Sequence, residues 1–83
     1  MYYVYCLVSK KNENFHYYGY TKDINSRLEA HNKGKVRTTH RFAPIELLGY
    51  KSFTEKQVAL EYEKKLKRSL WARKQFLDEL MNK

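Results

Sequence analysis

Hydrophobic residues near the start of the chain fall into two aromatic-rich runs separated by a polar segment. Residues 2–8 combine tyrosine with valine and leucine, residues 9–14 are polar or charged, and residues 15–20 are again aromatic. Aromatic and β-branched residues favour strands, and a short polar interruption is typical of a turn between strands. The pattern predicts an antiparallel hairpin near the N-terminus.

The spacing of apolar residues changes to that of a helix after the hairpin. Three residues stand at i, i+4 and i+7, the spacing of one helix face: Ile24, Leu28 and His31. Asp23 is a residue type that caps helix N-termini, and Gly34 stands where a left-handed residue ends a helix. These signals predict a first helix from Ile24 to Asn32.

One more strand and two more helices are predicted further along. After a polar, basic stretch without a period, residues 45–53 have the composition of a strand. Thr54 followed by Gln57 matches a capping box, so we expect a second helix over residues 55–68. Ser69 is suited to cap a third helix. The expected inner face of the second helix is formed by Ala59, Tyr62 and Leu66. That of the third helix is formed by Phe76, Leu77 and Leu80, together with either Trp71 or Ala72.

The predicted order of elements is ββαβαα. With 83 residues and no shift in composition, the chain is expected to form a single domain over residues 1–83. Strands from two separate blocks, with helices between and after them, indicate an α+β fold with a small three-stranded mixed or antiparallel sheet flanked by helices. We expect the helices to cover one face of this sheet.

Positive charge is the strongest feature of the composition. Seventeen basic residues against nine acidic ones give a net charge of +8. Many of the bases lie in two clusters, one over residues 33–41 and one over residues 64–74. Such a potential on a small body favours a polyanionic partner, and the alternative is a solvated surface that maintains solubility.

Other features of the composition narrow the class of protein. Cys6 is the single cysteine, which excludes an internal disulfide, and its hydrophobic neighbours predict a buried apolar residue. No apolar run is long enough to span a membrane, and we expect no membrane partner. These observations predict a cytoplasmic protein.

Two triplets and a set of polar residues behind them form an ordered pattern. The triplets are Tyr3-Val4-Tyr5 and Tyr17-Tyr18-Gly19. Arg27 and His31 follow on the first predicted helix, and Glu63 on the second. This pattern resembles the GIY-YIG nuclease superfamily over nearly the whole chain. It is most similar to the small stand-alone bacterial members, a branch similar to the nuclease module of the DNA excision-repair C subunit.

The resemblance implies a ββαβα core, one Mg²⁺ or Mn²⁺ ion without a small-molecule cofactor, and hydrolysis of phosphodiester bonds. Glu63 is the candidate metal ligand and a catalytic residue, because a hard cation on a carboxylate neutralises the charge that develops on a phosphate. The alternative for Glu63 is an i,i+4 ion pair with Lys67, which is an ordinary helix contact.

The resemblance also assigns catalytic roles to four other residues. Arg27 is expected to stabilise the charge of the transition state, and its alternative is a surface arginine. Tyr5 and Tyr17 supply phenols, one as the base and the other to orient water or phosphate, in an order left open; the alternative for each is packing in the sheet. His31 either shares the base role or contacts phosphate, or is a core residue with satisfied hydrogen bonds.

Gly19 is expected to allow a close approach of the chain or a turn between strand and helix, in a structural role that places Tyr17.

The expected partner is a nucleic acid, with DNA preferred. Five bases are the candidate contacts to backbone phosphates: Lys33, Lys35, Arg37, Arg41 and Lys67. We expect a structure-selective endonuclease of low sequence specificity that is a monomer or a weak dimer. The competing hypothesis is a nucleic-acid-binding module of the same fold that does not cleave.

Overall fold

The computed structural model describes residues 1–36 and 39–81. The helices and strands follow one another as β1 (Tyr2–Ser9), β2 (His16–Thr21), α1 (Ile24–Asn32), a short 3₁₀ helix η1 (His40–Phe42), β3 (Ile45–Phe53), α2 (Lys56–Arg68) and α3 (Leu70–Met81). The predicted α+β class and the order ββαβαα are therefore confirmed. The strands β1 and β2 form the expected hairpin.

The sheet is antiparallel throughout, with β1 in the centre and the order β2-β1-β3. Across β1, Tyr5 lies opposite Gly19 of β2 on one side and Tyr50 of β3 on the other. Directly opposite residues of neighbouring strands face the same side of a sheet. The register therefore places Tyr5 and Tyr50 on one common face.

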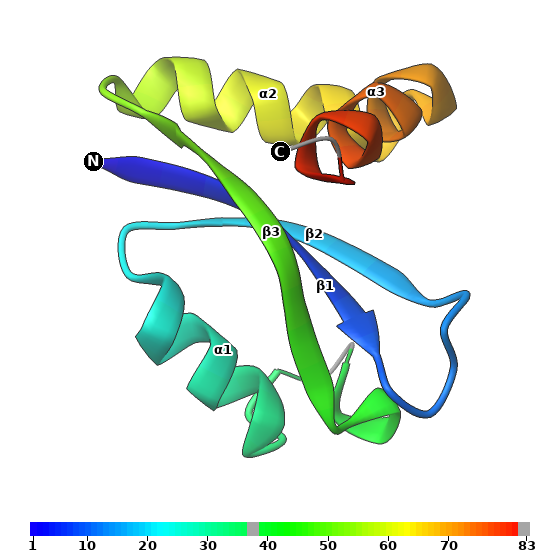
Figure 1. The fold of residues 1–83 in the computed structure, drawn as a ribbon. Helices are drawn as coiled ribbons and strands as arrows, with labels where there is room; N and C mark the ends of the chain where they lie inside the picture. The colour runs from blue at the N-terminus through cyan, green and yellow to red at the C-terminus, as the bar shows by residue number, and fades with distance from the viewer. Residues whose placement is uncertain (37–38, 82–83) are drawn as a thin grey trace.

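Helices cover both faces of the sheet, so the expectation of one covered face was wrong (Figure 1). Val4 and Cys6 pack against α2 and α3, whereas Tyr5 and Leu7 pack on the opposite side, where α1 contributes Leu28. The central strand is buried continuously from residue 4 to residue 7 because it carries large or apolar side chains on both faces. Burial of Cys6 confirms its predicted structural role and raises the pKa of its thiol to about 12.

The boundaries of α1 agree with the sequence signals. The Asp23 side chain accepts a hydrogen bond from the Ser26 backbone N–H at 3.1 Å, and Gly34 adopts a positive φ of 75° just after the helix. Asn32 joins the end of α1 to β3, because its side chain exchanges two hydrogen bonds with the backbone of Ile45. These contacts fix α1 against the sheet.

The expected capping box of α2 was wrong. The N-cap residue is Glu55, in an extended conformation, and no side chain caps the helix there. The Gln57 amide instead donates to the Glu61 carboxylate at 3.3 Å, one helical turn further on. Ser69, in contrast, caps α3 as predicted, because its hydroxyl accepts from the Ala72 backbone N–H at 3.1 Å.

The inner faces of α2 and α3 also match the predicted spacing. Ala59 and Leu66 are buried on α2, and Ala72 and Phe76 are buried on α3. Of the two residues considered at the start of α3, Ala72 lies in the core, while Trp71 is 62% exposed. Among the residues that the structure describes, no helix has both the length and the apolar character that a bilayer crossing requires.

Candidate active site

The phenol of Tyr5 is the centre of a buried polar cluster on the α1 side of the sheet. The side chain is only 2% exposed, although it ends in a hydroxyl. That hydroxyl accepts a hydrogen bond from Nε of Arg27 at 3.2 Å and lies 3.3 Å from Nε2 of His31. Both partners come from α1, where their spacing of four residues places them on one side of the helix.

His31 connects Tyr5 to the segment that follows α1. Its Nδ1 lies 2.7 Å from Oγ1 of Thr39, whose hydroxyl donates to the backbone carbonyl of Val36 at 3.5 Å. All these groups are satisfied when Nδ1–H donates to Thr39 and Nε2 accepts from the phenol of Tyr5. Thr39 was not expected from the sequence, because it lies in a stretch without any periodic pattern.

The electrostatic surroundings keep His31 neutral at neutral pH. Burial, followed by the nearby positive charge of Arg27, lowers the pKa of His31 to about 4. The side chain is fully buried. His31 therefore contacts the site through its hydrogen bond with the Tyr5 hydroxyl. This position agrees with the alternative of a core histidine with satisfied hydrogen bonds.

Burial also raises the pKa of the Tyr5 phenol above its ordinary value. The hydrogen bond and the positive charge of Arg27 oppose that rise, whereas Tyr17 and Glu63 add to it. The pKa of Arg27 rises in turn, mainly through its hydrogen bond to Tyr5 and despite the effect of burial. At neutral pH the pair is therefore a protonated phenol beside a guanidinium cation.

Gly19 provides the space in which the Tyr5 ring lies. A Cβ atom at this position would be 2.5 Å from Cζ of Tyr5 and would also overlap its hydroxyl oxygen. Gly19 is a residue of β2 opposite Tyr5, and it forms no turn. The predicted close approach is thus present, but the side chain that it accommodates is Tyr5 and not Tyr17.

Tyr17 lies on the same face as Tyr5, on the edge strand β2. It packs against the cluster that contains Tyr5, and its ring centroid is 5.1 Å from that of His31. Nζ of Lys67 lies 5.9 Å from the Tyr17 ring centroid. Because α2 packs on the other face of the sheet, this contact brings α2 and the Tyr17 phenol together at the β2 edge.

Glu63 lies one helical turn before Lys67 on α2. Its Oε2 atom is 3.5 Å from Nζ of Lys67, and the carboxylate side chain is 19% exposed while the lysine is 52% exposed. The ion pair considered from the sequence is therefore present. Glu63 is also close enough to Tyr5 to influence the pKa of the phenol. Glu63 therefore lies at the edge of the tyrosine cluster, a position that is compatible both with the ion pair to Lys67 and with a metal ligand.

The donors around Glu63 suit a hydrated hard cation. No group of three His, Cys, Asp or Glu residues within residues 1–36 and 39–81 could hold a metal ion. Mg²⁺ is commonly held by one or two carboxylates, with water and substrate phosphate as the remaining ligands. A single half-buried carboxylate fits that mode, and it does not fit a closed structural metal site.

Of the predicted phosphate contacts that the structure describes, Lys67 lies beside the tyrosine cluster and the others lie outside it. Lys33, Lys35 and Arg41 are exposed. Lys33 forms an ion pair with Glu29, and the Arg41 guanidinium lies 5.4 Å from the centroid of the Phe42 ring. Arg37 lies outside the described residues.

Comparisons with known proteins identify the family of this chain. A family model described as the GIY-YIG catalytic domain matches residues 1–75. A UPF0213 protein of Staphylococcus epidermidis (strain RP62A) is 38% identical over 61 residues, which are 72% of this chain and 74% of that protein. The UPF0213 protein YazA of Bacillus subtilis (strain 168) is 40% identical over 65 residues, 74% of this chain and 66% of that protein.

A UPF0213 protein of Streptococcus pneumoniae serotype 4 is 35% identical over 77 residues, 90% of this chain and 78% of that protein. No solved structure matches at a significant level. The family match covers both tyrosine triplets, together with Arg27 and His31 of α1 and Glu63 of α2. The chain therefore belongs to the GIY-YIG family and is similar to its small bacterial UPF0213 proteins.

Proposed function

We propose that this protein is a divalent-metal-dependent endonuclease that hydrolyses phosphodiester bonds in DNA with low sequence specificity. The observation that supports it most is the convergence of side chains from four elements on one small region. Tyr5, Arg27 and His31 are linked by hydrogen bonds, Tyr17 packs beside them, and Glu63 lies at the same edge. A chain of the GIY-YIG family that only bound nucleic acid would not require this carboxylate.

In this proposal Tyr17 is the base and Tyr5 is a positioning residue. Tyr5 is buried, its hydroxyl is engaged by Arg27 and His31, and burial raises its pKa, so that it cannot easily reach or deprotonate water. Tyr17 lies on the edge strand and is only partly buried, next to Lys67. A base must lie within hydrogen-bond reach of the water that it deprotonates, and the partly buried Tyr17 meets that condition better than the buried Tyr5.

Arg27 is proposed to bind the phosphate at which cleavage occurs. Its Nε is held by the Tyr5 hydroxyl, which fixes the plane of the guanidinium. A fixed guanidinium presents parallel N–H groups to phosphate oxygens. His31 contributes indirectly, by accepting the hydrogen bond that orients the Tyr5 phenol. The chain therefore aligns Arg27 before the substrate binds.

Glu63 is proposed to hold the metal ion. A bound Mg²⁺ or Mn²⁺ would neutralise negative charge on the phosphate and on the leaving oxygen. With a cation on Glu63, Lys67 would lose its partner in the ion pair and would be available for a neighbouring phosphate. Lys33, Lys35, Arg37 and Arg41 would contact the backbone further along the DNA, which sets affinity without reading sequence.

Cleavage of a panel of end-labelled nucleic acids tests this function. The panel contains single strands, duplexes, flaps, splayed arms, four-way junctions and an RNA equivalent, each with Mg²⁺, Mn²⁺ or EDTA. We expect metal-dependent cutting by the wild type, and a loss of at least a hundredfold in Glu63→Gln, by analogy with other electrostatic catalytic groups.

Glu61→Gln is the matched control, because Glu61 is an exposed carboxylate on the same helix that bonds to Gln57. Its cutting rate should equal that of the wild type. Equal rates in Glu63→Gln and wild type would refute the assignment of Glu63. Salt-sensitive binding without cutting in any metal would instead identify a non-catalytic nucleic-acid-binding module.

A further inference from the structure

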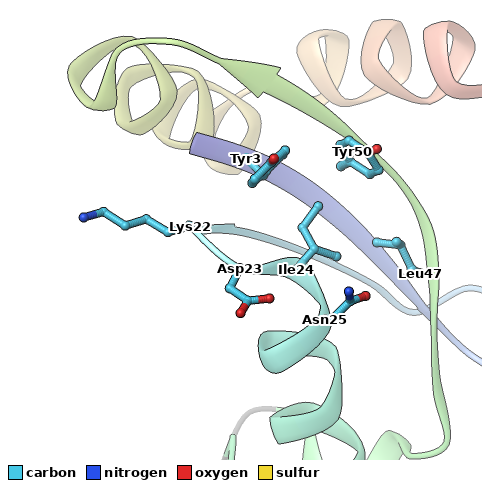
Figure 2. Close-up of a pocket in the computed structure, with 7 residues that line it drawn as sticks. All are labelled: Tyr3, Lys22, Asp23, Ile24, Asn25, Leu47 and Tyr50. Atoms are coloured by element: carbon cyan, nitrogen blue, oxygen red, sulfur yellow. The ribbon is translucent and has the colours of Figure 1, made fainter. Parts of the chain in front are cut away.

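A groove on the α1 side of the sheet has no role in the proposed chemistry. It lies between the start of α1 and the strands β1 and β3, and it has a volume of about 370 Å³ (Figure 2). Tyr3 and Tyr50 form its aromatic part, Ile24 and Leu47 its apolar wall, and Lys22 and Asn25 part of its polar rim. Its size is at the lower end of small-molecule sites in proteins.

The two tyrosines present an accessible aromatic surface. Their ring centroids are 5.5 Å apart with an angle of 85° between the planes, so the edge of one ring meets the face of the other. Tyr50 is 44% exposed. Although Tyr50 lies opposite Tyr5 in the sheet, the Tyr5 ring extends the other way, over Gly19, and leaves Tyr50 accessible.

The groove is adjacent to the candidate active site. Tyr3 and Tyr5 are two residues apart on β1, on one face, which corresponds to about 7 Å along the strand. About two stacked nucleotides span that separation, because each base step in a stacked strand rises by about 3.4 Å. A nucleic acid strand held at Arg27, whose guanidinium bonds to Tyr5, would therefore place a base about two steps away at the groove.

We propose that this groove is a nucleobase-binding subsite, in which a base close to the cleaved phosphodiester stacks on Tyr50. The inference rests on the proposed function and deepens it. A nucleobase has flat apolar faces and polar edges, which match the aromatic floor and the polar rim. The Asn25 amide provides both a donor and an acceptor for a base edge.

Binding without cleavage provides the first test. Anisotropy of a short fluorescein-labelled DNA strand is measured in EDTA with the wild type, Tyr50→Ala and Tyr50→Phe. Loss of one stacking contact should weaken binding about tenfold in Tyr50→Ala, whereas Tyr50→Phe keeps the aromatic face and should bind as the wild type does. Trp71→Ala is the control, because Trp71 is an exposed aromatic residue on α3, beyond the opposite face of the sheet.

The second test moves a single abasic site along the same strand. Removal of one particular base should weaken binding to the wild type about tenfold, and should have no effect on binding to Tyr50→Ala. Equal affinities of wild type and Tyr50→Ala, or an abasic site without effect at every position, would overturn the subsite. Failure to cut the intact strand and every other substrate with Mg²⁺ or Mn²⁺ would overturn the nuclease function and leave these binding results standing.

Discussion

Two buried tyrosine hydroxyls in this protein differ in their hydrogen bonding. The Tyr5 hydroxyl bonds to Arg27 and His31, whereas the Tyr20 hydroxyl has no partner among the described residues. Removal of a bonded hydroxyl leaves its partners unsatisfied, which costs about 1–3 kcal/mol, whereas removal of an unbonded buried one is neutral or favourable. We expect Tyr5→Phe to lower the free energy of unfolding by this amount and to reduce cleavage, because Arg27 loses its orienting contact.

Urea denaturation and a cleavage assay measure both effects. Tyr20→Phe is the matched control, and its unfolding free energy should equal or exceed that of the wild type. If Tyr5→Phe were as stable and as active as Tyr20→Phe, the Tyr5 hydroxyl would have no positioning role.

The depressed pKa of His31 gives the folded protein a definite response to acid. With a folded pKa of about 4 against an ordinary 6.5, the unfolded chain binds more protons between these values. Stability is therefore fully present above pH 6.5 and is lost as the pH falls toward 4, by up to about 3 kcal/mol. Chemical denaturation at a series of pH values measures this slope.

His31→Gln should flatten the dependence between pH 4 and 6.5, since glutamine does not titrate. His16→Gln is the control, because His16 lies outside the hydrogen-bonded cluster, and its profile should parallel that of the wild type. The lowered pKa values of Asp23 and Glu29 act in every variant and cancel in the comparison. An unchanged slope in His31→Gln would show that His31 does not determine the acid response.

The packing of β1 against β2 depends on the absence of a side chain at Gly19. An alanine Cβ there would overlap the rigid, buried ring of Tyr5, which cannot move without disturbing Arg27 and His31. We expect Gly19→Ala to destabilise the fold by about 1–3 kcal/mol, the usual cost of overpacking, and to reduce cleavage. Thermal unfolding and the cleavage assay measure the two effects.

Gly49→Ala serves as the comparison within the same sheet. A Cβ at Gly49 would lie 2.7 Å from Cδ2 of Leu80, the end of a partly buried aliphatic side chain that can change rotamer. Its loss of stability should be smaller, and its cleavage should be unchanged because Leu80 lies on the face away from Tyr5. Equal losses of activity in the two variants would argue against a specific Gly19–Tyr5 contact.

Elements whose sequence signals are local were predictable. The bounds of α1 follow from Asp23 and Gly34, and both residues act as the sequence indicated. The capping box at Thr54 was not formed, because the chain stays extended through Glu55 and the Gln57 amide bonds to Glu61. Local patterns identify candidate caps, but the path of the preceding strand decides which residue becomes the cap.

At the scale of the whole molecule, layers were harder to predict than elements. The sequence showed apolar faces on each helix but not the side of the sheet to which each helix returns. The run from Val4 to Leu7, which no charged or strongly polar residue interrupts, was the available signal, since strands covered on both faces lack a polar alternation. The cluster of Tyr5, Arg27 and His31 was expected from the family pattern, whereas Thr39 and the groove depend on three-dimensional contacts that leave no periodic trace.

The net charge of +8 should make the binding of nucleic acid strongly dependent on salt. Each phosphate neutralised on duplex DNA contributes about −0.9 to the slope of log affinity against log salt concentration. If Lys33 and Lys35 contact phosphates as proposed, replacing both with alanine should make that slope less steep by about 1.8. Fluorescence titrations at several salt concentrations give the slope for each variant.

A second double variant, Lys51→Ala with Lys56→Ala, distinguishes phosphate contact from net charge. Each double variant removes two positive charges and one exposed ion pair, Lys33–Glu29 in one case and Lys51–Glu79 in the other. Lys51 and Lys56 lie near the junction of β3 and α2, away from the segment that follows α1. The salt slope of this second variant should therefore stay close to that of the wild type. Equal reductions in both variants would mean that the protein attracts DNA through its overall charge, and that the segment after α1 is not its binding surface.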